Sequence, residues 1–409
     1  MKRFLSIFIL TLLPLSALAR PRYAAPERFG AKGDGVTDDS QAISECIRAG
    51  YSLKLKKRKT YVIRTALPDI PVSEFGIKSR GGTIVIDKDY PAVQSPQVFR
   101  FSSKIVKQNL LYVKGVNFIC RLGQKYDKND KTGDTYIFTV PYCDDVRFEK
   151  VNFSCGGEYN NVSFIVSYGC NISVCKCDFR LNTHSAQGGL FWLMNLNREN
   201  CTISLTDSYF EHDAMDECMC FSNGGKTNFD ESRITVNVKN CEFYSAGACP
   251  SSGFIIVYNN GDRAVLHYDG TYENCSFRSD GANHRKICSY QCGTAQPYRD
   301  YGTFESYYRN CSFDFQFTQS SEAGLLNLQA CNTNLCDENK VGYEFENCSF
   351  NLGNVSTILG DKDGVRKGYY TLRGCTINTT ERTVFKKKYN AGAGRISLTV
   401  EGCNRTENE

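Results

Sequence analysis

Short stretches of alternating apolar and polar residues recur along the chain, and each ends in a similar phrase. In the clearest copy, at 234–243, the alternation leads to Asn-Cys-Glu-Phe. Alternation with a period of two is typical of a half-buried β-strand. The last apolar position of each copy falls at Phe118, Phe153, Phe179, Phe210, Phe243, Phe277, Phe313, Phe350 and Ile377. These positions are 26 to 37 residues apart with no helical pattern between them, which predicts a solenoid of stacked strands.

Cysteine is frequent two positions before this apolar residue. The cysteines in question are Cys177, Cys241, Cys275, Cys311, Cys348 and Cys375. In stacked rungs they would form an inward column with a spacing of about 4.8 Å, which is too wide for easy disulfide formation. We therefore expect small buried thiols here, although 21 cysteines in an exported chain could suggest a disulfide framework. Cys288 with Cys292, and Cys331 with Cys336, are better disulfide candidates.

An asparagine precedes four of these cysteines, at Asn240, Asn274, Asn310 and Asn347. Asparagine tolerates the left-handed backbone conformation that tight turns require. Stacked rungs would bring these turns into line. We therefore expect a column of turns in which the amide side chains of successive rungs lie next to one another.

The first 19 residues have the features of a secretory signal. Lys2 and Arg3 precede the apolar run 4–15, and Ala-Leu-Ala at 17–19 resembles a cleavage site. The sequence therefore predicts a secreted, periplasmic or cell-surface protein, and no later run is long enough to span a membrane. Cleavage would remove Lys2 and Arg3 and lower the net charge from +5 to +3. This slight excess of positive charge favours anionic partners and gives no support for nucleic-acid binding.

The segment 29–39, Phe-Gly-Ala-Lys-Gly-Asp-Gly-Val-Thr-Asp-Asp, is followed by Gln-Ala-Ile at 41–43. It resembles the N-terminal signature of the pectin-lyase-like superfamily, which includes polygalacturonases, pectate lyases and phage tailspikes. The resemblance implies an all-β, single-chain, right-handed parallel β-helix. Thr37 or Asp38 can cap a helix at about 39–49 that has Ile43, Cys46 and Ile47 on one face. Such a helix would cover the open first rung of the solenoid.

The expected organisation is a signal peptide at 1–19, an N-terminal cap with the first rungs at 20–97, and further rungs at 98–409. One continuous core can use nearly all of this length. We expect the protein to be a monomer.

The segment that follows Phe210 carries the strongest chemical signal. His212, Asp213, Asp216 and Glu217 lie within a few residues of one another and lead into an apolar strand. Carboxylates held close together raise the pKa of one of them, which creates an acid beside a base, and glycoside hydrolysis requires two carboxyl groups. The alternative is a solvated acidic turn.

Asp-Glu-Cys-Met at 216–219 resembles the Asp-Asp-Cys-Ile of polygalacturonases. The resemblance implies that Asp216 is the general acid and that Glu217 activates water. Asn182, Thr183 and His184 stand where that family has Asn-Thr-Asp, with His replacing Asp. The stretch 284–286, His-Arg-Lys, lies on the rung that carries the family's clamp for the substrate carboxylate, and an Arg fork with a Lys charge suits a uronate.

The sequence thus predicts hydrolysis of an acidic polysaccharide without a cofactor or metal. The expected catalytic residues are Asp216, Glu217, Asp213 and His184, and the expected substrate-binding residues are His212, His284, Arg285 and Lys286. A lyase that removes a proton beside a uronate carboxylate is an alternative, and it could use Ca²⁺ held by carboxylates. A glycan-binding or adhesin-like solenoid without enzymatic activity is another. Tyr159, Trp192 and Tyr290 are candidates for lining a sugar groove, although the apolar surroundings of Trp192 favour a buried position.

Overall fold

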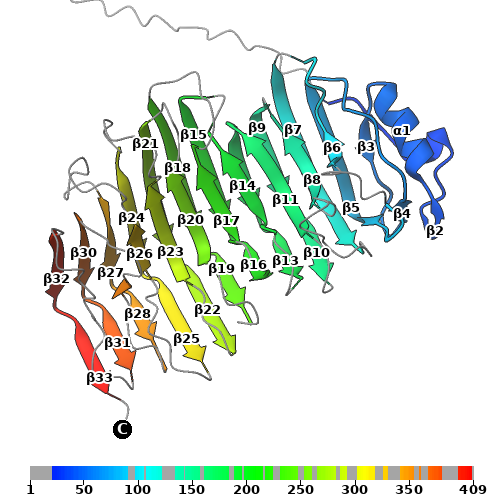
Figure 1. The fold of residues 1–409 in the computed structure, drawn as a ribbon. Coiled ribbons are helices and arrows are strands. Elements are labelled where there is room, and N and C mark those ends of the chain that lie inside the picture. The colour runs from blue at the N-terminus through cyan, green and yellow to red at the C-terminus, as the bar shows by residue number, and fades with distance from the viewer. Residues whose placement is uncertain are drawn as a thin grey trace, which may run out of the picture.

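The computed structural model shows one continuous coil of parallel strands (Figure 1). It describes residues 21–90, 97–105, 107–121, 134–141, 143–156, 161–183, 188–195, 198–214, 217–223, 231–246, 253–259, 265–281, 286–292, 302–317, 326–329, 341–353, 359–360, 367–379 and 395–407. The predicted right-handed parallel β-helix is confirmed. The signal segment 1–19 lies outside the described residues, and the expected monomer stays a prediction.

Each turn of the coil from β5 to β29 contributes to all three stacks, the turns before β5 and after β29 contribute to the first two, and every pairing between rungs is parallel. The first stack consists of β1 (Tyr23–Ala24), β3 (Ser52–Lys54), β5 (Glu74–Ile86), β7 (Gln108–Cys120), β9 (Cys143–Glu149), β12 (Asn171–Cys175), β15 (Asn200–Thr206), β18 (Glu231–Lys239), β21 (Val265–Glu273), β24 (Phe304–Arg309), β27 (Val341–Glu346), β30 (Lys367–Arg373) and β32 (Arg395–Glu401). The long strands β5 and β7 continue around the corner and also belong to the second stack.

The other members of the second stack are β2 (Asp34–Asp38), β4 (Thr60–Ile63), β10 (Asn152–Gly156), β13 (Asp178–Asn182), β16 (Tyr209–Asp213), β19 (Glu242–Ser245), β22 (Ser276–Gly281), β25 (Ser312–Phe317), β28 (Ser349–Asn351), β31 (Thr376–Thr379) and β33 (Asn404–Glu407). The third stack consists of β6 (Gln97–Arg100), β8 (Asp134–Val140), β11 (Asn161–Tyr168), β14 (Phe191–Met194), β17 (Met219–Ser222), β20 (Gly253–Asn259), β23 (Lys286–Cys292), β26 (Leu326–Gln329) and β29 (Leu359–Gly360). The core lies between the three stacks.

The repeated aromatic position forms a continuous inner stack, as the sequence predicts. Phe210 pairs with Phe243 on the next rung, and Phe243 pairs with Phe277. Their ring centroids are 5.0 Å and 4.7 Å apart, with nearly parallel planes. All three side chains are fully buried. One large side chain per rung at the same position therefore fixes the register along the coil.

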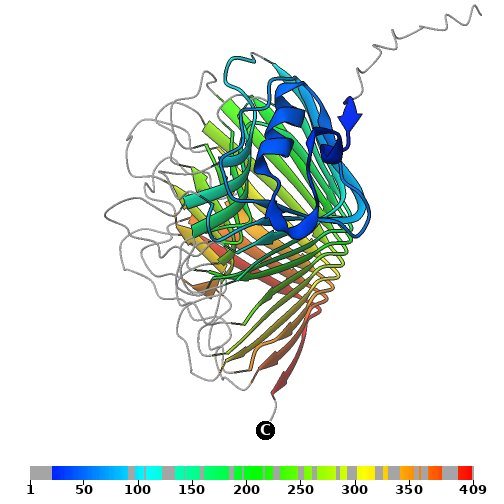
Figure 2. The same cartoon turned by 90° about the vertical axis from the view of Figure 1, so that its right-hand side faces the viewer.

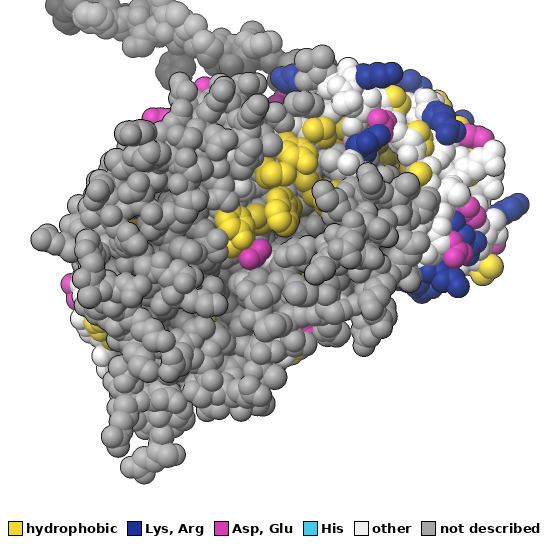
Figure 3. Space-filling view, in the orientation of Figure 1, with side chains coloured by type: hydrophobic (Ala, Val, Ile, Leu, Met, Phe, Trp, Pro, Cys, Tyr) yellow, Lys and Arg dark blue, Asp and Glu magenta, His cyan; other side chains and the backbone are white. Residues whose placement is uncertain are grey.

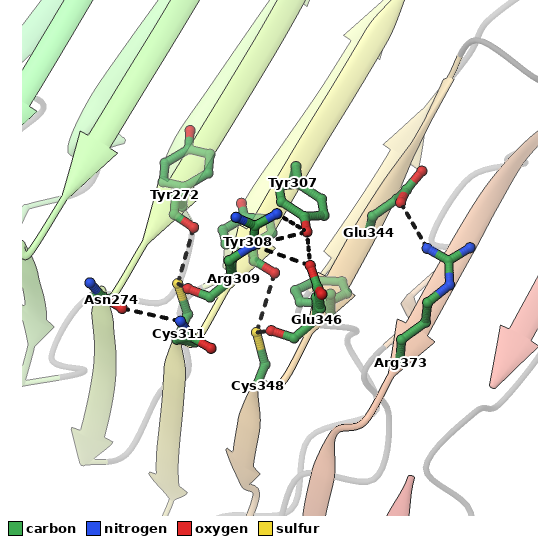
Figure 4. Close-up of polar contacts among 12 residues, drawn as sticks. Tyr272, Asn274, Tyr307, Tyr308, Arg309, Cys311, Glu344, Glu346, Cys348 and Arg373 are labelled. Carbon is green, nitrogen blue, oxygen red and sulfur yellow. Dashed lines mark hydrogen bonds and ion pairs between the residues drawn. The ribbon is translucent and has the colours of Figure 1, made fainter. Parts of the chain in front are cut away.

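The corner between the first and second stacks is a single residue in the left-handed conformation. Asn240, Asn274, Asn310 and Asn347 have φ between 52° and 54°. The Asn310 side-chain amide donates to Oδ1 of Asn274 across 3.4 Å (Figure 4). The predicted column of asparagine turns is confirmed, and hydrogen bonds link the side chains of successive turns.

The inward cysteine column is also confirmed. Cys241, Cys275, Cys311, Cys348 and Cys375 are buried free thiols. The Cys311 and Cys348 sulfurs lie 3.5 Å and 3.4 Å from backbone carbonyl oxygens on the preceding rung (Figure 4). These thiols thus fill space and bond weakly to the backbone, as expected of small core residues. Cys288 is buried, whereas the side chains of its suggested partner Cys292 and of the pair Cys331 and Cys336 lie outside the described residues.

The N-terminal end of the coil is covered by a helix, as Figure 2 shows. Helix α1 (Ser40–Arg48) lies within the predicted range and buries Ile43, Cys46 and Ile47. The N-cap residue is Asp39 and not Thr37 or Asp38 as predicted, and the Asp39 side chain makes no capping hydrogen bond. Asp38 Oδ1 accepts a hydrogen bond from the Ser40 backbone N–H at 3.0 Å, and this contact satisfies one of the free donors of the first turn. A short helix, η1 (Pro26–Phe29), lies beside α1. Within the described residues, no helix has the length and apolar character that a membrane crossing requires.

Candidate functional site

The outer face of the third stack carries an apolar strip. Its side chains alternate with inward-facing residues, and they are Val166, Trp192, Cys220 and Ile256 in one row and Tyr168, Met194, the polar Ser222 and Tyr258 in the next. Tyr168, Trp192, Met194 and Tyr258 are partly exposed, whereas the other four are buried. Trp192 is partly exposed and does not belong to the core cluster, whereas its neighbours Phe191 and Leu193 do. In the space-filling view, hydrophobic side chains gather in a hollow on this face with acidic atoms at one end (Figure 3).

Glu217 lies two residues before β17 and is partly exposed. Its segment is held between two rungs, because the Cys218 carbonyl accepts from the Leu190 N–H at 2.9 Å and the Cys218 N–H donates to Gly253 O at 3.3 Å. A Cβ atom on Gly189 would come within 2.6 Å of the Glu217 carbonyl oxygen, so this approach requires glycine.

Glu217 and the strip are close along the strand direction. Trp192 pairs with Cys220, which follows Glu217 by three residues. At about 3.3 Å per residue in an extended strand, Glu217 and the tryptophan lie at most about 10 Å apart along the strand direction, because Cys218, which lies between Glu217 and β17, is in a bend. This distance is comparable with the length of a short oligosaccharide, so one ligand could contact both groups.

His212 and Asp213 at the end of β16 are buried. His212 Nε2 lies 3.0 Å from the Gly188 carbonyl oxygen. Its ring therefore holds the segment before β14, and direct contact with a ligand at the surface would need a rearrangement there. Asp213 pairs in register with Asn182 of the preceding rung, as the repeat predicts.

A polar network on the outer side of β13 and β16 surrounds Glu211. Its carboxylate accepts from Asn182 Nδ2 at 2.7 Å and from the Tyr209 hydroxyl at 3.2 Å. The Arg180 guanidinium lies 3.4 Å from Glu211, and it makes a two-pronged ion pair with Asp178. Burial, followed by the charge of Glu211, raises the pKa of Tyr209, so the tyrosine stays a neutral donor.

The other predicted site residues are only partly covered. Asp216, His184, His284 and Arg285 lie outside the described residues. Lys286 begins β23, which pairs with β20, but its side chain is also outside the description. The catalytic assignments therefore stay predictions. The structure brings Asn182 and Asp213 side by side at the ends of neighbouring second-stack strands, and Glu217 follows Asp213 in the segment that leads to β17 of the third stack.

Two aromatic expectations change with the structure. Tyr290 is fully buried in the core, because it occupies an inward position of β23, so it cannot line a groove in this conformation. Trp192 is partly exposed on the outer face, which corrects the expectation of a buried position. The alternation of Phe191 and Leu193 around it is the signal that could have identified its side of the sheet. Tyr159 lies outside the described residues.

Among the side chains that the structure describes, no group of three or more His, Cys, Asp or Glu residues is arranged to hold a metal ion.

The sequence is similar to two phage proteins of known type. It is 28% identical over 284 residues to the "Depolymerase 1, capsule K30/K69-specific" of Klebsiella phage K5-2, a match that covers 64% of this chain and 35% of that protein. It is 36% identical over 77 residues to the "Depolymerase 1, capsule KN3-specific" of Klebsiella phage KN3-1, covering 16% of this chain and 10% of that protein. This chain thus spans about a third of the length of the first relative and about a tenth of the length of the second. No family model matches the sequence.

Solved structures of similar shape include the family 28 exopolygalacturonase of Yersinia enterocolitica. It has a TM-score of 0.43 and 12% identity, over 94% of this chain and 78% of that one. Another is the surface adhesin PfbA of Streptococcus pneumoniae, with a TM-score of 0.41 and 12% identity over 92% and 100%. This chain therefore has the fold of a right-handed parallel β-helix with an N-terminal capping helix, and its segment 29–43 resembles the N-terminal signature of the pectin-lyase-like superfamily.

Proposed function

We propose that this protein degrades an acidic polysaccharide outside the cell by hydrolysing its glycosidic bonds. The observation that carries the proposal is a partly exposed carboxylate, Glu217, held between rungs at one end of an apolar strip that contains Trp192. Flat apolar surface suits the faces of sugar rings, and carboxylates supply the acid and base of glycoside hydrolysis.

The similarity to a capsule-specific depolymerase adds support, because it extends over 284 residues of the chain. The net charge, which is +5 for the full chain and +3 without Lys2 and Arg3 of the expected signal segment, slightly favours an anionic substrate. Both observations bear on the class of substrate. Neither identifies the sugar.

In the proposed mechanism, Asp216 protonates the glycosidic oxygen as the bond to the anomeric carbon breaks. Glu217 accepts a proton from the water that attacks this carbon, so one carboxyl group is the acid and the other the base. We propose that His184 and Asp213 assist them, and that His284, Arg285 and Lys286 hold the substrate carboxylate. His212 bonds to Gly188, so its contribution is to position the segment before β14.

The test is a reducing-end assay on charged and neutral polysaccharides, with ultraviolet absorbance read in parallel. Glu217→Gln and Asp216→Asn should each lower the rate by about 10²-fold or more, because general acid–base catalysis contributes 10²–10⁴-fold. Glu242→Gln is the matched control, since Glu242 is an exposed carboxylate on β19 of the second stack.

Each result decides between the alternatives. New reducing ends without a rise in absorbance, lost in both variants, would support the hydrolase. A rise in absorbance would mean elimination and move the assignment to a lyase. Wild-type activity in Glu217→Gln would remove this residue from the mechanism. Binding of a polysaccharide without any cleavage would favour a glycan-binding protein.

A further inference from the structure

A basic concavity of about 690 Å³ lies near the N-terminal end of the coil, on the first stack and its corner. The residues that line it are Ala25, Lys54, Leu55, Lys56, Lys57, Lys78, Ser79, Arg80 and Lys114. Ala25 follows β1, and the other residues come from β3, β5 and β7 and the turn after β3, whereas Trp192 lies in the third stack and Glu217 lies just before it. The concavity is therefore separate from the candidate site described above.

Three of its lysines are stacked in register. Lys54 pairs with Lys78, and Lys78 pairs with Lys114 on the following rung. Parallel strands are about 4.8 Å apart, so this arrangement places like charges opposite one another, which is destabilising in a sheet. A fold that keeps such a column needs something to offset the repulsion.

The same column further along the coil avoids this repulsion by alternating charge. Its members are Lys239, Glu273, Arg309, Glu346, Arg373 and Glu401, on successive rungs. Lys239 pairs with Glu273 at 3.0 Å and Arg309 with Glu346 at 3.2 Å (Figure 4). The run of three lysines is thus a departure from the charge pattern that this column follows elsewhere.

Only part of the basic concavity is neutralised within the protein. Lys114 pairs with Glu149 at 2.8 Å, and Lys56 lies 3.5 Å from Glu27. Lys54, Lys57, Lys78 and Arg80 form no ion pair with any described residue.

Lys78 is the most enclosed of the three stacked lysines. Its ammonium lies 3.6 Å from the centre of the Tyr23 ring. Burial, and then the charge of Lys54, lower the pKa of Lys78. An anion placed between the lysines would offset this lowering of the pKa, because an opposite charge favours the protonated amine.

We propose that this concavity binds a carboxylate-bearing segment of the acidic polysaccharide, at a distance from the cleavage site. The inference rests on the proposed function for the identity of the polymer. A linear chain that lies along the coil axis could present successive carboxylates to Lys54, Lys78 and Lys114, and the partly exposed Ala25 could contact one of its sugar rings. Such a site would hold a long polymer on the enzyme between cleavage events.

The experiment measures binding of polygalacturonate to the full chain that carries Glu217→Gln, so that cleavage does not interfere. Isothermal titration at two salt concentrations would compare this background with the triple variant Lys54→Gln, Lys78→Gln and Lys114→Gln. The matched control is Lys239→Gln, Arg309→Gln and Arg373→Gln, which removes the same charge from the same column where it is paired. Circular dichroism would verify that all variants are folded.

We expect the first triple variant to lose about tenfold or more in affinity at low salt, and the control to stay within about twofold. The loss should shrink as salt screens the charges. Equal losses in both triple variants would mean a general charge effect and overturn the proposal. Unchanged affinity in the first triple variant would also overturn the proposal. So would a protein that binds inorganic polyphosphate but not polygalacturonate. Lysine-dependent binding by a wild-type protein that cleaves nothing would keep this site and reject the hydrolase.

Discussion

The side-chain amide of Asn274 donates a hydrogen bond to Oδ1 of Asn240 on the preceding rung, across 3.3 Å. Both residues turn the corner between the first two stacks with φ of 54°. Each asparagine thus does two things at once, since it adopts a backbone conformation that most residues avoid and links its rung to the next. These two contributions can be separated by mutation.

Asn274→Ala should destabilise the coil more than Asn274→Gly. Alanine loses the amide and is strained at positive φ, which costs about 1–2 kcal/mol, whereas glycine loses only the amide because it tolerates this conformation. Thermal unfolding followed by circular dichroism would give the order wild type, Gly, Ala. Equal melting temperatures for the two variants would show that backbone conformation is not what selects asparagine here.

The buried cysteines should resist alkylation in the folded protein. Burial raises the pKa of Cys177 and of Cys241 to about 12, so almost none of either thiol is the reactive thiolate at neutral pH. Mass spectrometry after iodoacetamide treatment should find both modified only in denaturant. Cys175 is partly exposed on the strand beside Cys177 and serves as the reactive control. Labelling of Cys241 at the rate of Cys175, or a disulfide at either ladder position, would contradict a column of inert thiols.

Trp192 offers a direct test of the apolar strip. It is the single tryptophan of the chain, so intrinsic fluorescence reports on this position alone. We expect oligosaccharides of the substrate to shift its emission, and Trp192→Ala to raise KM about tenfold with a smaller change in kcat, since aromatic contacts contribute about 0.5–1.5 kcal/mol. Trp192→Phe should recover part of the loss. Unchanged emission at saturating substrate would remove the strip from the binding site.

The fold could be predicted from the sequence because each repeat contains residues with distinct physical roles. Phe243, Cys241 and Asn240 each occupy one position of the rung. The phenylalanine marks the side of the strand that faces the core, the cysteine marks the inward column of thiols, and the asparagine marks the corner. Pairing in register then follows from the identical spacing of these letters in neighbouring rungs.

The basic column could not be found in the same way. Lys54 and Lys78 lie in rungs without a copy of the repeated phrase, Lys114 lies in the first copy, which lacks Asn-Cys, and the register of β5 with β7 shifts between Lys78 and Gly82. Without a marker in each rung, the sequence does not reveal which charges become neighbours. For a similar reason, the sequence alone could not show that Glu217 and Trp192 lie near each other, because the distance between them depends on how β14 and β17 pair.

Glu149, which terminates the basic column, should make the stability of the coil depend on pH in the acidic range. Hydrogen bonds from the Lys114 ammonium at 2.8 Å and the Tyr112 hydroxyl at 2.8 Å lower the pKa of the Glu149 carboxyl. Because the folded-state pKa is below the unfolded value of about 4.3, the contribution is present above that pH and is lost as the pH falls through the lowered value. Wild type should therefore exceed Glu149→Gln in melting temperature at pH 6 by more than at pH 3.

The size of the difference should be small, since partly exposed ion pairs contribute less than about 1 kcal/mol. Glu242→Gln is the control, because Glu242 is exposed and forms no ion pair with any described residue. A difference between wild type and Glu149→Gln that stays constant from pH 3 to pH 6 would contradict a charge effect, since loss of packing does not depend on protonation. A difference that vanishes at high salt would support it, and it would identify Glu149 as the group that limits repulsion where the lysine column ends.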